Sequence, residues 1–217
     1  MRRSGRPKNP LTRPQLIALA RNVFASRGVD GVSLREVADL AGIRKASLLH
    51  HFESKQDLYS AVLEDTLAKM LELIGAARLD EGDFLERLDR LGTLVTEYFA
   101  TNPETARLLV RELIGEGAYL DDPKGRQRVQ EVLELTAAFL EAGMESGAFG
   151  RSDPRQLALS IAGLHLLPYS AWRASETFLG GKLDSKTQIA ERTAAVLPQV
   201  RALCGVTGST SSLRSST

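Results

Sequence analysis

Apolar side chains recur at every third or fourth position along most of the chain, the spacing that gathers them on one face of an α-helix. The pattern is clearest in the stretches Ile17 to Phe24, Leu67 to Ile74 and Ala106 to Leu113. Strict alternation of apolar and polar residues, which indicates a β-strand, is nearly absent. We therefore expect an all-α protein in which each helix buries one face.

Capping residues mark several helix starts. Ser33, Ser54 and Ser185 are each followed three residues later by an acidic residue or a glutamine, the spacing of a capping box. Asn102 and Asp153 each precede a proline, which suits the first position of a helix. These signals predict about nine helices, at residues 12–27, 34–41, 45–51, 55–77, 84–101, 103–115, 124–146, 154–179 and 186–204.

The composition is that of an ordinary globular protein, with 217 residues of which 43% are hydrophobic and 25% charged. The longest uncharged stretch, Leu157 to Trp172, is shorter than a bilayer span, so we expect no membrane helix. A single cysteine, Cys204, cannot form an internal disulfide. The chain begins without an apolar signal core. We expect a cytoplasmic protein without cofactor or metal.

Charge is segregated along the chain. Residues 1–59 hold 11 Lys and Arg against five Asp and Glu, whereas residues 60–217 hold 17 against 22. A basic first quarter joined to an acidic remainder indicates that one end of the protein meets a polyanion. Charge alone does not distinguish DNA from RNA or from a membrane surface.

The most specific pattern lies in residues 28–55. A short helix capped by Ser33 is followed by Gly42, which suits a left-handed turn, and then by a second short helix. We expect the pair to be a helix-turn-helix. The apolar residues expected between its helices are Val37, Ala38, Leu40, Ala41, Ile43 and Leu48. The outward residues, nearly all hydrogen-bond donors as DNA recognition in the major groove requires, are Arg35, Arg44, Lys45, Ser47, His50 and Lys55.

The order of residues in this segment resembles the DNA-binding domain of TetR-type transcription regulators. The matching positions are Gly31, Ser33, Val37-Ala38, Ala41-Gly42-Ile43, His51-Phe52 and Ser54-Lys55. The resemblance covers about residues 11–60. The chain departs from the family at Arg44, where Ser or Thr commonly caps the recognition helix, and at Leu49, where a Tyr hydroxyl commonly reaches a phosphate.

The resemblance implies a three-helix DNA-binding domain followed by a helical domain that binds a small molecule and dimerises. We place a flexible basic arm at residues 1–10, the helix-turn-helix domain at 11–54, the ligand-binding and dimerisation domain at 55–205 and a disordered tail at 206–217. Within the arm, Arg6 between Gly5 and Pro7 can enter a narrow minor groove, and an unspecific basic tail is the alternative.

Roles in DNA binding are assigned from chemistry and resemblance together. We expect phosphate contacts from Ser33, Ser47 and Lys55, because donors at helix starts point at the DNA backbone. Contacts in the groove are expected from Arg44, Lys45 and His50. A solvated charge on a surface helix is the alternative for each of them. In a separate role, His51 and Phe52 are expected to pack inside.

A helix-turn-helix of this size contacts only a few base pairs, so we expect a homodimer on an inverted repeat in double-stranded DNA. The resemblance places the interface on the last two helices. The candidates are Leu157, Ala158, Ile161, Ala162, Leu164 and Trp172, together with residues 189–203. An internal core helix is the alternative.

The resemblance also implies a cavity for a small-molecule effector. The candidate lining residues are Met70, Tyr98, Phe99, Tyr119, Phe139, His165 and Tyr169. Plain core packing is the alternative for the aromatic residues and the methionine, and a hydrogen-bonded core histidine is the alternative for His165. Pro168 should bend its helix or leave a carbonyl free.

These features predict a ligand-responsive DNA-binding transcription regulator, usually a repressor in this family. An enzyme is disfavoured, because three histidines, two of them adjacent, and one cysteine supply neither a catalytic constellation nor a metal site. The alternative is a helical protein-interaction module that no longer binds specific DNA. Arg44 and Leu49 favour that alternative, because neither carries the expected hydroxyl.

Overall fold

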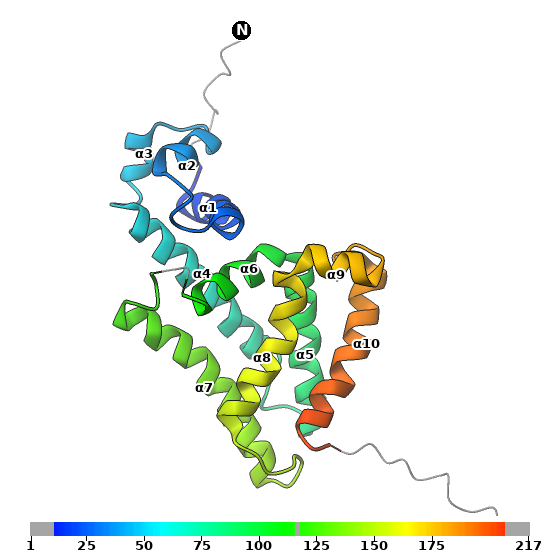
Figure 1. Cartoon of the computed structure of the whole chain (residues 1–217). Coiled ribbons are helices and arrows are strands. Elements are labelled where there is room, and N and C mark those ends of the chain that lie inside the picture. Colours follow the sequence, from blue (N-terminus) through cyan, green and yellow to red (C-terminus); the bar gives the residue numbers. More distant parts are fainter. Residues whose placement is uncertain (1–10, 116–117, 207–217) are drawn as a thin grey trace, which may run out of the picture.

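The computed structural model describes residues 11–115 and 118–206, and all regular structure in these ranges is helical (Figure 1). Arg6 and the predicted arm lie outside the described residues, as does the predicted tail from residue 207. The helices are α1 (Arg13–Arg27), α2 (Leu34–Leu40), α3 (Lys45–Leu49), α4 (Lys55–Ala76), α5 (Phe84–Thr101), α6 (Pro103–Leu113), α7 (Pro123–Glu145), α8 (Pro154–Ser170), α9 (Trp172–Leu179) and α10 (Lys186–Leu203).

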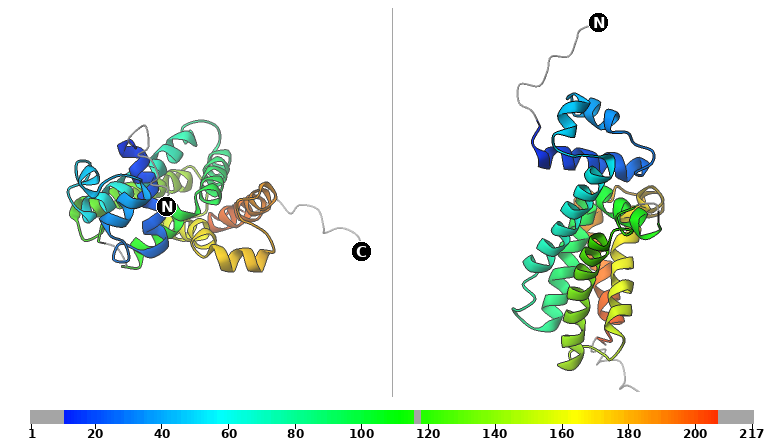
Figure 2. Two further views of the ribbon diagram at one scale, coloured as in Figure 1. Left: turned by 90° about the horizontal axis from the view of Figure 1, so that it is seen from above. Right: turned by 90° about the vertical axis from the view of Figure 1, so that its left-hand side faces the viewer.

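Helices α1 to α3 form a small lobe, and α4 runs from it into a bundle formed with α5 to α10 (Figure 2). The all-α prediction is confirmed. Within the described ranges, no helix is long and apolar enough to cross a membrane. The same ranges hold no group of three or more His, Cys, Asp or Glu side chains placed to bind a metal ion.

The predicted helix at 154–179 is wrong in one respect, because the chain forms two helices there and the described residues hold ten. Ala171 leaves the helical region, with φ −94° and ψ 33°, and α9 turns away from α8 (Figure 1). Pro168 has no N–H to donate to the carbonyl of Leu164. The guanidinium of Arg192 replaces it, with Nη2 donating to that carbonyl at 2.7 Å. The prediction that Pro168 frees a carbonyl is therefore confirmed.

A first hydrophobic core joins α1, α2, α3 and the start of α4. The ring of Phe24 meets that of Tyr59 edge to face, with centroids 5.2 Å apart. The predicted inward residues Val37, Ala38, Ala41 and Leu48 are buried, and Ile43 packs against them. Leu40 is 59% exposed, so its predicted burial is wrong. It lies about 100° around the helix from the face that carries the buried residues.

A second body of apolar packing holds the bundle together. Three rings from α5, α7 and the α7–α8 turn, Phe84, Phe139 and Phe149, lie with centroids 5.8 to 5.9 Å apart. The Arg201 guanidinium on α10 pairs with both carboxylate oxygens of Asp89 on α5. Cys204 is buried at the end of α10, and burial raises the pKa of its thiol to about 11. It is therefore a neutral core side chain.

Two glycines within helices provide a matched test of this packing. A methyl group at Gly75 of α4 would meet no atom within 4 Å, so Gly75→Ala should raise the free energy of unfolding by about 1 kcal/mol through helix propensity. A methyl group at Gly143 of α7 would lie 2.1 Å from the buried ring of Phe149. Gly143→Ala should lower that free energy by about 1–3 kcal/mol. Urea unfolding measures both, and equal effects would contradict the packing.

Candidate DNA-binding surface and ligand cavity

The predicted DNA contacts in the described residues all lie at the surface of the small lobe. Five of them are exposed, namely Ser33, Arg35, Arg44, Lys45 and His50. The other two, Ser47 and Lys55, are half-buried. No ion pair engages Arg44, Lys45 or Lys55 within the described residues, and Arg35 approaches Asp39 only at 4.0 Å with both side chains exposed. These donors are therefore available to an external partner.

Three of these residues converge at the start of α2. Ser33, Lys45 and Lys55 line one shallow hollow of about 500 Å³, which also contains Asp30 and Glu36. Ser33 and Glu36 form the predicted capping box, with Glu36 N donating to Ser33 Oγ at 3.2 Å and Ser33 N donating back at 2.8 Å. Hydrogen bonds from Ser33 lower the pKa of Glu36. Two lysines beside a helix start provide a site where a phosphate oxygen can bind.

Helix α3 shows the two departures from the family pattern. Arg44 occupies its N-cap position and makes no side-chain capping hydrogen bond. Leu49 is 40% exposed on the same short helix. Both side chains therefore lie on the outer surface, where a guanidinium can contact phosphate or guanine and a leucine can contact a thymine methyl.

The adjacent pair His51-Phe52 divides between surface and core. Phe52 is buried as predicted, with the guanidinium of Arg13 over its ring at 4.9 Å. His51 is exposed, so its predicted packing role is wrong. The chain leaves α3 at His50, and the turn that follows buries only the phenylalanine.

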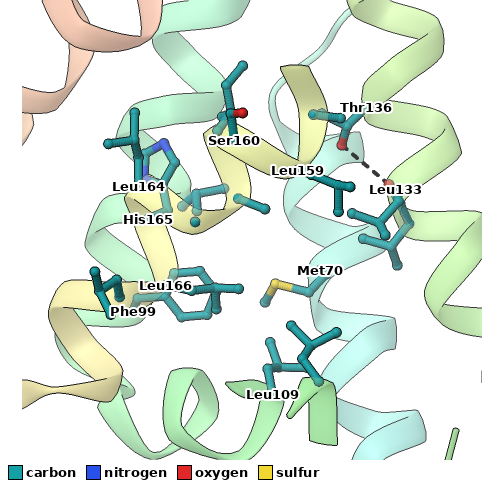
Figure 3. Close-up of a pocket in the computed structure, with 18 of the residues that line it drawn as sticks. Met70, Phe99, Leu109, Leu133, Thr136, Leu159, Ser160, Leu164, His165 and Leu166 are labelled. Carbon is teal, nitrogen blue, oxygen red and sulfur yellow. Dashed lines mark hydrogen bonds between the residues drawn. The ribbon is translucent and has the colours of Figure 1, made fainter. Parts of the chain in front are cut away.

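A cavity of about 790 Å³ opens between α4, α5, α6, α7, α8 and α10. Figure 3 shows Met70, Leu109, Leu133 and Leu159 around it, from α4, α6, α7 and α8 respectively. Leucine, valine and isoleucine supply most of the wall. Several lining residues are themselves exposed, among them Leu113, Ile114, Leu159 and Leu167, so the cavity communicates with the surface. Its chemistry suits an apolar ligand.

Five of the predicted lining residues lie on this cavity, namely Met70, Phe99, Tyr119, Phe139 and His165. The other two do not line it. The hydroxyl of Tyr98 faces that of Thr105 at 3.5 Å, and Tyr169 is buried with its ring 6.2 Å from that of Phe99. Sequence reasoning missed the leucines of α6 and α8, and it missed Arg192 on α10. Helical spacing marks a residue as inward without showing whether it meets another side chain or a void.

His165 lies on the cavity wall and is also hydrogen-bonded within the core. Thr96 donates its hydroxyl proton to Gly92 O at 2.7 Å, so it can only accept from His165 Nδ1, which lies 3.2 Å away. The proton of the neutral ring is thereby fixed on Nδ1. Burial, with a smaller contribution from Arg192, lowers the pKa of His165 to about 4. The ring is therefore uncharged at neutral pH.

Helix α6 lies between the cavity and the small lobe. Leu109 and Leu113 line the cavity, whereas Leu108 is buried in the first core. Arg111 Nε donates to Ala25 O of α1 at 3.3 Å. One short helix thus contacts both the cavity and the small lobe.

A buried hydrogen-bond group reinforces that contact. Glu112, at the end of α6, accepts from the Tyr59 hydroxyl of α4 and from Leu120 N, each at 2.7 Å. Tyr119 donates to Glu64 of α4 at 2.5 Å. Burial and the neighbouring carboxylates raise the pKa of both tyrosines, so both stay protonated donors. Glu112 and Tyr119 also line the cavity.

Comparison with known proteins identifies the family. Residues 16–62 match the model of bacterial regulatory proteins of the tetR family, and residues 85–200 match the tetracyclin repressor-like C-terminal domain. The chain belongs to the TetR family. It is a DNA-binding transcription regulator, as the helix-turn-helix pattern predicts.

Named relatives of this TetR-family protein agree with that assignment. The transcriptional repressor KstR2 of Rhodococcus jostii (strain RHA1) is 32% identical over 155 residues, which are 65% of this chain and 69% of the relative. The structure of the ketosteroid transcriptional regulator KstR2 of Mycobacterium tuberculosis has a TM-score of 0.69 and 23% identity, and the match covers 88% and 96% of the two chains. AibR in complex with isovaleryl coenzyme A and operator DNA has a TM-score of 0.69 and 19% identity, covering 87% and 97%.

The predicted dimerisation residues of this TetR-family chain lie mostly on the inner side of α8. Leu157 and Ala158 are buried within the chain, and Ile161, Ala162, Leu164 and Trp172 are half-buried. The exposed apolar positions of α8 are Leu159 and Leu167, with Gly163 between them. The outer face of α10 carries small residues at Ala190, Ala194, Ala195 and Ala202.

The lowered pKa of His165 predicts acid sensitivity. The unfolded chain binds a proton at this ring below its ordinary pKa of 6.5, whereas the folded chain binds it only near 4. The stabilising contribution is therefore complete above pH 6.5 and is lost as the pH falls toward 4, by up to about 3 kcal/mol. His165→Gln should flatten this part of the urea-unfolding profile. The exposed His51→Gln serves as control, and an identical profile for all three proteins would contradict the assignment.

Proposed function

We propose that the protein is a homodimeric repressor that binds an inverted-repeat operator in double-stranded DNA and is released by an apolar small-molecule effector. The observation that carries the proposal is that α6 contacts both the cavity and α1. The relative KstR2 of Rhodococcus jostii, a transcriptional repressor, supports repression as the mode of regulation. The AibR complex with isovaleryl coenzyme A and operator DNA supports the pairing of ligand and DNA. Operator binding places its activity in the cytoplasm.

At the operator, the exposed donors of the small lobe divide into two roles. Ser33, Ser47 and Lys55 contact phosphates, and the hollow shared by Ser33, Lys45 and Lys55 supports a backbone contact there. The groove is contacted by Arg44, Lys45 and His50. Arg35 adds positive charge beside them, and Arg6 enters the minor groove.

Dimerisation uses the outer face of α10, with the predicted interface residue Trp172 at the start of α9. The exposed alanines of α10 permit close approach of a further helix from a second copy. A two-fold arrangement places two recognition helices about one turn of DNA apart.

The coupling between ligand and DNA follows from α6 and the carboxylate of Glu112. An effector that fills the cavity contacts Leu109 and Leu113 and moves α6. Leu108 and Arg111 on the same helix then displace α1, while Tyr59 transfers the shift to α4. The recognition helices change their separation and leave the operator. By linkage, DNA weakens effector binding by the same factor.

Selection of duplex DNA by the purified protein at physiological salt tests the proposal first. Enrichment of an inverted repeat is the expected result. A folded dimer that enriches no sequence, with or without candidate effectors, would favour the helical protein-interaction module. Two features agree with that alternative: Leu49 is exposed, and Arg44 makes no capping hydrogen bond at the start of α3. Specific binding must also weaken steeply with added salt.

Substitution of two lysines separates phosphate contacts from base contacts. Lys55→Ala should weaken binding to all sequences alike and reduce the salt slope by about two per dimer, one for each lost phosphate contact. Lys45→Ala should in addition relax the preferred sequence by about 1–3 kcal/mol per altered base contact. Lys124→Ala, at an exposed position of α7, is the control. Unchanged affinity and preference in all three variants would refute the assigned surface.

The bond between Tyr59 and Glu112 can be tested by removing one hydroxyl. Tyr59→Phe leaves a buried carboxylate oxygen without its donor, so the free energy of unfolding should fall by about 1–3 kcal/mol. Effector-induced release from DNA should weaken as well. Tyr98→Phe removes a hydroxyl whose contact is long, 3.5 Å, and should change stability by less than about 0.5 kcal/mol. Equal losses in both variants would show that the Tyr59 bond has no special role.

A further inference from the structure

One charged side chain on the cavity wall has no opposite charge beside it. Arg192, on α10, lines the cavity and is half-buried. Within the described residues, no carboxylate lies within ion-pair distance of its guanidinium. An arginine stays charged even when burial lowers its pKa, as it does here. A charged group that is partly removed from water is stabilised when an opposite charge binds beside it.

The protein uses only part of the guanidinium. Nη2 donates to Leu164 O at 2.7 Å, in place of the N–H that Pro168 lacks. The other N–H groups of Arg192 make no hydrogen bond to the described residues. Their nitrogens are not among the fully buried atoms that lack a partner, so a ligand can reach them. Tyr169 and His165 both interact electrostatically with Arg192, and the Tyr169 hydroxyl, which does not line the cavity, has no hydrogen-bond partner among the described residues. On the cavity wall, Arg192 therefore offers free donors and positive charge.

Apart from the exposed Gln199, the other polar side chains of the wall already have partners. Thr136 and Ser160 donate to the carbonyls of Val132 and Gln156, as Figure 3 shows for Thr136. Glu112 accepts two hydrogen bonds at the opposite end, on α6. His165 is neutral and bonded to Thr96. Of the two charged side chains of the described wall, Glu112 has a hydrogen bond on each carboxylate oxygen, whereas Arg192 has only the one to Leu164 O.

We infer that the effector is a carboxylic acid with an apolar body, whose carboxylate binds Arg192 while its body fills the leucine-lined cavity. The planar guanidinium matches a carboxylate in geometry, and a charged hydrogen bond inside an apolar wall is strong. A neutral ester of the same body would leave the charge of Arg192 uncompensated. The inference rests on the proposed ligand response and adds the chemical class of the effector.

Binding of matched acids and esters tests the inference. The probes are dodecanoate with methyl dodecanoate, abietate with methyl abietate as a fused-ring pair, and dodecanoyl coenzyme A. Affinities are measured by equilibrium dialysis on the full chain, and release is measured on the selected operator. In the wild type at least one acid should bind at least tenfold more tightly than its ester.

Variants of Arg192 identify the group that recognises the carboxylate. Arg192→Gln keeps a donor for Leu164 O and removes the charge, so affinity for the acid should fall about 10- to 100-fold while affinity for the ester stays unchanged. Arg192→Lys keeps the charge without the planar fork and should restore part of the preference. Lys186→Gln removes one exposed positive charge from the same helix and is the control. Urea unfolding verifies that each variant is folded.

Four results would overturn the inference. The wild type could bind acids and esters with equal affinity, or Arg192→Gln could lower the affinity for both equally. Either result would show that Arg192 only donates to Leu164 O and does not recognise the ligand. Binding of dodecanoyl coenzyme A alone, insensitive to Arg192→Gln, would refute the carboxylate while leaving the proposed ligand response intact. If no probe binds or releases DNA from a protein that selects an inverted repeat, the inference and the apolar effector both fail.

Discussion

The buried carboxylate of Glu112 joins the two halves of the molecule. It accepts from Tyr59 of α4 and from Leu120 N, and Tyr59 in turn packs against Phe24 in the core of the small lobe. A buried charge is tolerated only where its hydrogen bonds are complete, so these donors must keep their positions together. The position of the DNA-binding lobe relative to the cavity wall is thereby fixed. Any change that displaces Glu112 should therefore also displace Tyr59 on α4 and, through Phe24, helix α1.

The cavity has an energetic consequence for the free protein. Leucines at its rim, such as Leu113 and Leu167, are more than half exposed. Covering a large apolar side chain stabilises by about 1.5–3 kcal/mol. An occupant that covers several of them stabilises the geometry in which it fits, and that geometry becomes the populated one.

The sequence predicts the helix-turn-helix better than the cavity, for a physical reason. Capping at Ser33, the turn at Gly42 and the packed face around Val37 are set by residues within about ten positions of each other, so a local pattern specifies them. His51 shows the limit, because burial just after a five-residue helix depends on the direction in which the chain leaves that helix. The cavity depends on how six helices pack, and no local pattern contains that information. Arg192 illustrates the point, since its partner lies 28 residues away.

Pro168 gives the bundle an unusual dependence between distant positions. The proline removes one backbone donor from α8, and a guanidinium from α10 restores it. In a related chain with a residue other than proline at position 168, the backbone N–H of that residue would donate to the carbonyl at 164. The side chain at position 192 would then not be needed for this hydrogen bond. The two positions are therefore expected to vary together through evolution. A proline in one helix thus constrains which amino acids another helix can carry, and through it the kinds of molecule to which the regulator can respond.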